Sequence, residues 1–297
     1  LGTLGAVSSE VWPMALAPWV LLPLIRVRSG DERRAAARSG VAALLLGGVN
    51  AVASGAALVL PAVWLVTRRQ SRQVRRLQAW WVVATTAACL WWVVPLLILG
   101  RYSPPFLDWI ESSAITTAPG SLTEALRGTT QWIPGLVTTQ GPRWPAAHAV
   151  LVQRPAIALG LALALLGLAG AAHRGMPHRR FLVLGLLTGL VLVTAGHVGT
   201  ATGPVAGQVQ VLLDGALSPL RNVHKFEPVV RVPLVLGLAH VLSLRVPVVS
   251  TAAPWVRRLT LVVTGAALLT LVTPAALMGV SQLGVYREVP GYWRDAA

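Results

Sequence analysis

Four basic side chains lie close together at the edge of an apolar segment in the C-terminal half of the chain. Arg221, His224 and Lys225 are spaced i, i+3 and i+4, so a short helix over 219–227 would place them on one face. A guanidinium beside an ammonium suits a phosphate at a membrane surface. We therefore predict a donor-phosphate site from these three residues and Arg231. The alternative is that the cations anchor a helix end by snorkelling.

Carboxylates near such a site matter because a transfer reaction needs a general base within hydrogen-bond reach of the attacking hydroxyl. Ser103-Pro104-Pro105 is a helix-start signal, and a helix over Phe106–Ala114 would bring Asp108 and Glu111 together at i, i+3. The two carboxylates equally suit the solvated face of an interfacial helix. Glu227 is a third candidate, although it also has the spacing to pair with a nearby arginine.

Further polar residues lie at the ends of apolar segments and are candidates for lining a substrate cavity. Arg101 and Tyr102 follow one apolar run, and His197 follows another. Asn50 lies within a third run, where it would cap a bend. The ordinary roles, interfacial anchoring and a packed histidine, stay open for each of them.

The composition places these residues in a membrane protein. Of 297 residues, 55% are hydrophobic and only 12% are charged, about half the charge of a soluble domain. The net charge is +15, but the arginines cluster in short segments between apolar runs, which is typical of the positive-inside rule and not of nucleic-acid binding. The single cysteine excludes an internal disulfide framework.

The apolar runs predict membrane segments. They are Val11–Ile25, Val41–Val66, Ala79–Leu99, Pro155–Ala172, Phe181–Gly196, Val232–Leu244 and Thr260–Val280. The 41–66 run lies between two arginine clusters, Arg26–Arg38 and Arg68–Arg76. A hairpin bent near 50–55 would keep both clusters on one side of the membrane, whereas a single crossing would separate them. The protein therefore has eight membrane segments with the hairpin and seven without it.

The predicted fold class is an all-α polytopic transmembrane bundle. Its two long loops, 101–153 and 199–230, carry few arginines and are predicted to face outward with short interfacial helices. Ser121-Leu122-Thr123-Glu124 has the capping-box pattern that begins one of them. Residues 204–217 keep helical apolar spacing and predict another.

Three long segments carry a resemblance to a known family. They are residues 100–112 (GRYSPPFLDWIES), 220–228 (LRNVHKFEP) and 289–297 (VPGYWRDAA), and residues 47–51 (GGVNA) add a shorter one. These sequence segments resemble those of the α-(1→3)-arabinofuranosyltransferases of mycobacterial cell-wall arabinan, the AftD type. The resemblance runs along the whole chain.

The resemblance implies a GT-C membrane glycosyltransferase of actinobacteria in the plasma (inner) membrane. Such enzymes take arabinose from a polyprenyl-phosphate donor, decaprenylphosphoryl-arabinose, and build the arabinan of arabinogalactan and lipoarabinomannan on the periplasmic side. Transfer from the β-linked donor to an α product would invert the anomeric centre. By this likeness, residues 1–280 are part of the membrane domain and 281–297 begin a periplasmic segment.

One departure from the family pattern affects the catalytic assignment. Members usually carry a catalytic aspartate in the first outer loop, and nothing in this sequence matches that loop. We therefore expect a fragment that lacks the catalytic base and is inactive alone, with Asp108 and Glu111 as the acceptor-side candidates. No zinc spacing or nucleotide-binding loop is present, and the sequence does not decide whether a divalent cation accompanies the donor.

Two other functions are compatible with the same residues. A transporter or flippase for lipid-linked sugars would use an ionisable group within a span, and His240 is the main one. A non-catalytic scaffold would use the basic inner face, Arg68–Arg76, to hold anionic membrane lipid or an acidic cytoplasmic protein such as an acyl carrier protein.

Overall fold

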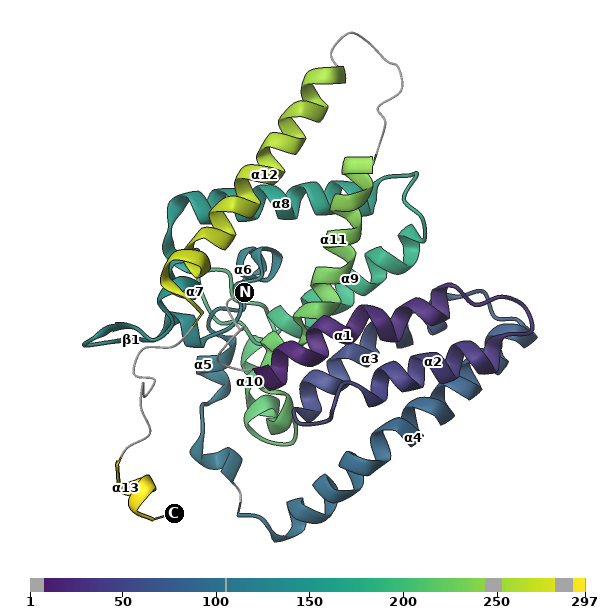
Figure 1. Ribbon diagram of the computed structural model, residues 1–297, viewed down its shortest axis with the longest axis horizontal. Coiled ribbons are helices and arrows are strands. Elements are labelled where there is room, and N and C mark those ends of the chain that lie inside the picture. Colours follow the sequence, from purple (N-terminus) through teal and green to yellow (C-terminus); the bar gives the residue numbers. More distant parts are fainter. Residues whose placement is uncertain (1–7, 105, 244–252, 281–290, 297) are drawn as a thin grey trace.

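The computed structural model describes residues 8–104, 106–243, 253–280 and 291–296, and these form a helical protein with two bundles (Figure 1). Helices α1 to α4 lie side by side in the first bundle, and α8, α9, α11 and α12 form the second. Helix α3 contacts both α9 and α11 and so joins the two. The long helices are α1 Ser8–Ile25, α2 Glu32–Leu44, α3 Ala51–Thr67, α4 Arg72–Tyr102, α8 Arg154–Ala172, α9 Arg179–Thr194, α11 Glu227–Ser243 and α12 Ala253–Met278.

Short elements fill the two long connections between these helices. The α4–α8 connection holds η1 Phe106–Trp109, α5 Ser113–Thr117, α6 Leu122–Arg127, η2 Ile133–Gly135, strands β1 Val137–Thr138 and β2 Gly141–Pro142, and α7 Pro145–Val152. The α9–α11 connection holds α10 Ala206–Asp214, η3 Ser218–Leu220 and η4 Val223–Phe226, and α13 Gly291–Asp295 follows α12. The strands form a two-residue antiparallel pair, with Val137 opposite Pro142.

The helical membrane class is confirmed. Four described segments are long and apolar enough to cross a bilayer: Arg72–Tyr102, Arg154–Ala172, Val223–Ser243 and Arg258–Met278. The helical segments Ser9–Ile25 and Ala51–Thr67 are apolar but shorter. The prediction of seven or eight membrane segments stays a prediction.

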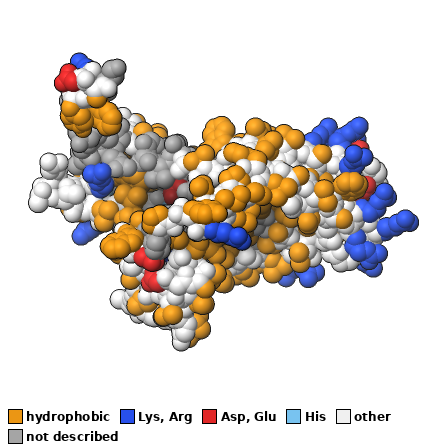
Figure 2. All heavy atoms as spheres, turned by 90° about the horizontal axis from the view of Figure 1, so that it is seen from below, with side chains coloured by type: hydrophobic (Ala, Val, Ile, Leu, Met, Phe, Trp, Pro, Cys, Tyr) orange, Lys and Arg blue, Asp and Glu red, His pale blue; other side chains and the backbone are white. Residues whose placement is uncertain are grey.

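The 41–66 run is broken, as the hairpin interpretation requires. Helix α2 ends at Leu44 and α3 begins at Ala51, so the bend precedes the predicted position near 50–55. Gly47 and Gly48 have φ angles of +81° and +64°, a left-handed conformation that favours glycine. Asn50 caps α3 as expected, because its Oδ1 accepts a hydrogen bond from Ala53 N at 3.1 Å. Both arginine clusters lie at the same end of the molecule, where the blue side chains gather in Figure 2.

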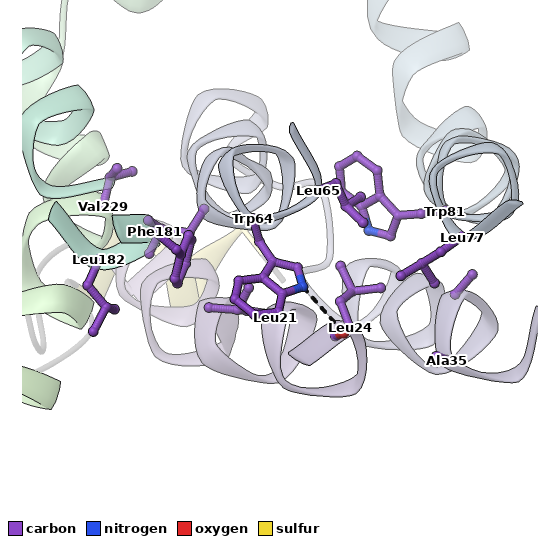
Figure 3. Close-up of a cluster of buried hydrophobic side chains, with 12 residues drawn as sticks. Leu21, Leu24, Ala35, Trp64, Leu65, Leu77, Trp81, Phe181, Leu182 and Val229 are labelled. Carbon is purple, nitrogen blue, oxygen red and sulfur yellow. Dashed lines mark hydrogen bonds between the residues drawn. The ribbon is translucent and has the colours of Figure 1, made fainter. Parts of the chain in front are cut away.

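Buried tryptophans join the first bundle through hydrogen bonds as well as apolar contacts (Figure 3). Trp64 Nε1 donates to the backbone oxygen of Leu24 at 3.3 Å. Trp81 Nε1 donates to Ser39 Oγ at 3.0 Å, and that hydroxyl donates to Val20 O at 2.7 Å. Trp81 therefore belongs to the core of the first bundle.

Two helix starts differ from the predicted ones because charged residues continue the helix. Helix α4 begins at Arg72, seven residues before the predicted Ala79, and includes part of the second arginine cluster. Helix α11 begins at Glu227 and not at Val232. Hydropathy alone marks only the apolar part of a helix, so both starts were placed too late. The capping hydroxyl predicted for α6 is confirmed, since Ser121 Oγ accepts from Glu124 N at 3.2 Å.

The predicted interfacial helix over 106–114 does not form. Residues 106–109 are a 3₁₀ turn, and Ser103 is the C-cap of α4 rather than the N-cap of a new helix. The backbone is used in tertiary contacts, because Leu107 O accepts from Arg221 and Ser113 N donates to Asp214. These bonds replace the helical ones that the local pattern predicted.

Helices α8 and α11 cross with their backbones in contact. A β-carbon on Gly167 would lie 2.6 Å from Leu234 O, and one on Gly170 would overlap the carbonyl oxygen of Gly237. A β-carbon on Gly237 would in turn overlap Gly167 O. Small residues allow this approach in membrane helices.

We expect Gly170→Ala to destabilise the protein, because the added methyl group must push α8 and α11 apart. Overpacking of this kind costs about 1–3 kcal/mol, so the melting temperature in detergent should fall by several degrees. Gly265→Ala in α12 is the matched control, since its β-carbon would meet open space. Equal melting temperatures for the two variants would contradict the close crossing.

Candidate functional site

A buried carboxylate at the start of α1 gathers the polar groups of this site. Glu10 is 6% exposed. Its Oε1 lies 3.2 Å from Lys225 Nζ, and its Oε2 lies 3.0 Å from His224 Nε2. Asn50 Nδ2 and Gln131 Nε2 donate to the same carboxylate at 3.5 and 3.4 Å. One carboxylate therefore joins α1, the hairpin bend, the α4–α8 connection and η4.

The predicted single cationic face over 219–227 is wrong. The stretch forms two 3₁₀ turns, η3 and η4, separated at Arg221 and Asn222. His224 and Lys225 turn toward Glu10, whereas Arg221 is 5% exposed and donates to Leu107 O. Tertiary bonds interrupt a continuous helix here, because the Arg221 carbonyl accepts from Thr116 at 2.7 Å.

Arg221 instead belongs to an ion pair with Asp214. Arg221 Nη1 lies 3.6 Å from Asp214 Oδ1, while Ser113 donates to that carboxylate from its backbone N at 2.7 Å and its hydroxyl at 2.6 Å. Partial burial raises the pKa of Asp214, but the Ser113 hydrogen bonds and the Arg221 charge outweigh it and lower the pKa below its ordinary value of 3.8. Asp214 thereby joins α10 to α5.

Arg231 binds the C-terminal end of α6, and Glu227 binds the connection that follows it. Arg231 Nη1 donates to Leu126 O at 2.7 Å, and its Nη2 donates to Ala125 O. The guanidinium thereby satisfies carbonyls at the C-terminal end of α6. Glu227 Oε1 accepts from the hydroxyl of Thr130 at 2.5 Å and from its backbone N at 3.3 Å.

A cavity of about 320 Å³ opens beside these groups. Its polar side is formed by the end of α6, Gln131, Trp144, His224 and Glu227. Its apolar side is formed by α7 and by α12, which contributes Leu268, Leu271, Val272 and Ala275. The cavity therefore combines a polar end with an aliphatic wall.

Four residues that line the cavity each have one buried polar atom without a hydrogen-bond partner among the described residues. These atoms are Arg127 Nε, Gln131 Oε1, Trp144 Nε1 and His224 Nδ1. Buried polar atoms without a partner are costly and uncommon. Two of them are N–H donors, one is a carbonyl acceptor, and the imidazole nitrogen can serve either way. Together they suit a ligand rich in oxygen.

The remaining predicted site residues are not brought to this cavity. Arg101 and Tyr102 are exposed at the end of α4, and Asp108 is exposed in η1. Glu111 Oε1 accepts from Asn222 Nδ2 at 2.6 Å. His197 Nδ1 lies 3.2 Å from Thr117 O, at the end of α5.

Sequence reasoning missed Glu10 and Arg127. Glu10 lies one residue before the predicted start of the first span, and an isolated carboxylate at a span end was the available signal. Arg127 follows Glu124 at i+3, and the two pair at 2.7 Å with the arginine side chain 2% exposed. Its Nη2 also donates to Val150 O at 2.9 Å and so joins α6 to α7.

The described residues offer no cluster of three or more His, Cys, Asp or Glu arranged to hold a metal ion. The polar side chains that line the cavity are those of Arg127, Thr129, Gln131, Trp144, His224 and Glu227.

Comparison with solved structures defines the class of protein. The chain superimposes on the cryo-EM structure of the arabinofuranosyltransferase AftD from mycobacteria with a TM-score of 0.69 and 39% identity, covering 99% of this chain and 18% of that one. A mutant form of that enzyme matches with a TM-score of 0.66. The fold is that of a GT-C membrane glycosyltransferase.

The particular family follows from the sequence comparisons. The chain belongs to the AftD family, because the family model described as "Alpha-(1->3)-arabinofuranosyltransferase, N-terminal GT-C domain" matches residues 1–297. It is 44% identical to the α-(1→3)-arabinofuranosyltransferase of Mycolicibacterium smegmatis and 45% identical to that of Mycobacterium tuberculosis. Both alignments cover 100% of this chain and 22% of the relative, so the chain spans about a fifth of the length of these proteins.

We expect Glu10→Gln to destabilise the protein strongly, because it leaves Lys225 buried without a countercharge. Removal of one partner of a buried ion pair costs about 3–5 kcal/mol. Glu10→Gln combined with Lys225→Met should recover part of this loss in a double-mutant cycle of thermal unfolding. Additive losses in the cycle would show that the two side chains do not interact.

We expect Asp214→Asn to lower the free energy of unfolding at pH 7 by about 1–2 kcal/mol, since a hydrogen-bonded charge is lost. A lowered folded-state pKa means that the stabilisation is complete above pH 3.8 and is lost as pH falls through the lowered value. As the pH falls below about 4, the free energy of unfolding should therefore decrease less for the variant than for the wild type. Asp108→Asn, at an exposed position, is the control and should leave the free energy of unfolding at pH 7 unchanged.

Proposed function

We propose that the complete protein that contains this chain is a membrane arabinofuranosyltransferase. It takes arabinofuranose from a polyprenyl-phosphate donor, decaprenylphosphoryl-arabinose, and adds it to cell-wall arabinan on the periplasmic side. Membership of the AftD family and 44–45% identity along the chain support this activity.

The cavity beside His224 is the observation that carries the proposal. A polyprenyl-phosphate sugar has a hydroxylated ring, an anionic phosphate and a long aliphatic tail. The unpartnered polar atoms at one end of the cavity suit the ring and the phosphate, and the α7 and α12 side chains suit the start of the tail. Ligand sites in proteins commonly combine an apolar lining with a few converging polar groups.

Within this cavity we assign the phosphate to His224, Arg127 and Trp144. Each lines the cavity and presents an unpartnered ring or guanidinium nitrogen. Glu10 Oε2 lies 3.0 Å from His224 Nε2 and so fixes the orientation of the imidazole ring, while Nδ1 keeps no protein partner. Gln131 Oε1 is an acceptor for a sugar hydroxyl.

The other predicted phosphate ligands take positioning roles in this proposal. Lys225 neutralises Glu10, Arg221 pairs with Asp214, and Arg231 holds the end of α6 that forms the cavity rim. Their charges are engaged by protein groups, so they fix the geometry of the residues that face the ligand.

The chemistry is a single displacement with inversion. An acceptor hydroxyl attacks the anomeric carbon, the bond from that carbon to the phosphate oxygen breaks, and polyprenyl phosphate leaves with an added negative charge. Nitrogen donors that meet this developing charge lower the barrier. The hydroxyl proton passes to a general base that we place outside this chain.

We expect Trp144→Phe and His224→Ala in the complete protein to lower kcat/KM for arabinose transfer by roughly 10- to 100-fold each, as for loss of one hydrogen bond to a charged group. Transfer from synthetic lipid-linked arabinose to an arabinan acceptor is the assay, with thermal unfolding measured in parallel.

Trp91→Phe is the matched control, because Trp91 lies on α4 and is 54% exposed. It should retain full activity. Wild-type rates in both cavity variants would contradict the assignment of the phosphate to these residues. Movement of the donor across vesicle membranes without arabinose transfer would favour a flippase over a transferase. His240 gives the flippase no central ionisable group, since it lies near the end of α11 beside His173.

A further inference from the structure

A second cavity lies at the opposite, arginine-rich end of α1. Its volume is about 360 Å³. Four arginines line it, Arg26 and Arg28 after α1 and Arg34 and Arg38 on α2, together with a single carboxylate, Asp31. The proposed enzymatic reaction uses none of these residues.

The chemistry of this cavity favours a phosphate group. Arg34 and Asp31 pair at 3.6 Å with both side chains exposed, a weak interaction that leaves the remaining arginines in excess. Guanidinium groups bind phosphate oxygens in a bidentate manner. The cavity also includes the start of α2, where the Asp31 side chain makes no capping bond, so the helix N-terminus adds favourable partial charge.

An apolar strip is formed by exposed residues of α1 and α2 that lie on the same helix faces as residues of the cavity wall. On α1, Trp12 and Trp19 share a face with Leu22 and Arg26 at heptad spacing, and both tryptophans are more than half exposed. The wall of the cavity next to this strip includes Leu22 and Pro23.

Helix α2 supplies the other side of the strip. Arg34, Arg38, Val41 and Leu45 recur at helical spacing and are all exposed. The two helices touch at the far end, because Trp12 Nε1 donates to Leu45 O at 2.7 Å. Charge at one end and the apolar strip leading away from it match a headgroup and an acyl chain.

We propose that this cavity binds one anionic phospholipid, with its phosphate among Arg26, Arg34 and Arg38 and an acyl chain along Trp19 and Val41. The lipid comes from the leaflet at the arginine-rich end, which the positive-inside rule predicts to be the cytoplasmic one. Basic pockets between membrane helices recognise lipid headgroups in this way.

The test uses the complete protein, stripped of lipid in a neutral detergent and titrated with phosphatidylglycerol or phosphatidylcholine. Native mass spectrometry counts the bound lipids. The triple variant Arg26→Gln, Arg34→Gln, Arg38→Gln should weaken phosphatidylglycerol binding roughly 100-fold, since each basic group near an anionic lipid contributes a factor of about five. Phosphatidylcholine binding should not change.

The matched control neutralises Arg69, Arg72 and Arg75, three exposed arginines of the other cluster that do not line the cavity. It should bind phosphatidylglycerol as the wild type does. Trp19→Ala tests the acyl strip without altering charge, and it should weaken phosphatidylglycerol binding but not the binding of glycerol phosphate.

Several outcomes would overturn the proposal. Equally weakened phosphatidylglycerol binding in the control variant would indicate a diffuse basic surface instead of a defined site. Equal affinity for glycerol phosphate and phosphatidylglycerol would indicate a site for free anions. The arginines would instead serve a protein partner if the wild type bound no phosphatidylglycerol and an acidic protein bound to the wild type but not to the triple variant. A fall in melting temperature of the lipid-free triple variant would make the arginines structural.

Discussion

The buried charge of Glu10 is the constraint on which the arrangement of the site depends. A carboxylate that is 6% exposed near the end of a membrane helix needs countercharge and hydrogen bonds to persist. Lys225 and His224 supply the charge from η4, and Asn50 and Gln131 add donors from two other segments. The position of η4 follows from this demand, and η4 in turn leads into α11 beside the cavity.

The same interaction explains why cations that adjoin in sequence have different roles. Glu10 takes up the charge of Lys225, and Asp214 takes up that of Arg221. His224 lies between them, with Nε2 on Glu10 and Nδ1 without a protein partner. The cavity is therefore bordered by one oriented imidazole and not by a diffuse cluster of charge.

Sequence reasoning was reliable where local chemistry decides the structure. Arginines on both sides of the 41–66 run predicted a bend within it, and the structure has that bend between Leu44 and Ala51, slightly before the predicted 50–55. Ser121 begins α6 for the same local reason. The resemblance carried in 100–112 and 220–228 also led to the correct family.

Prediction from the sequence failed where tertiary contacts replace the hydrogen bonds of a helix. The spacing of Arg221, His224 and Lys225 favours one helix, but Thr116 and Leu107 bind Arg221 from more than 100 residues away. Glu10 and His224 are separated by 214 positions, and no pattern in a single sequence indicates such a pairing. Asn50 and Glu227 were predicted site residues, and the structure places Asn50 against Glu10 and Glu227 in the cavity lining. Arg127 and Trp144 needed the fold to bring α6 and α7 beside the cavity.

The charged residues at the two ends of helix α1 limit how this helix can move. Glu10 is held at one end and Arg26 lies at the other, a separation of about 24 Å at 1.5 Å per residue. A slide of one turn, about 5.4 Å, in either direction would separate Glu10 from Lys225 and His224 and leave these charges without their partners. Translation of α1 along its own axis is therefore disfavoured, whereas tilting about its charged ends keeps these contacts.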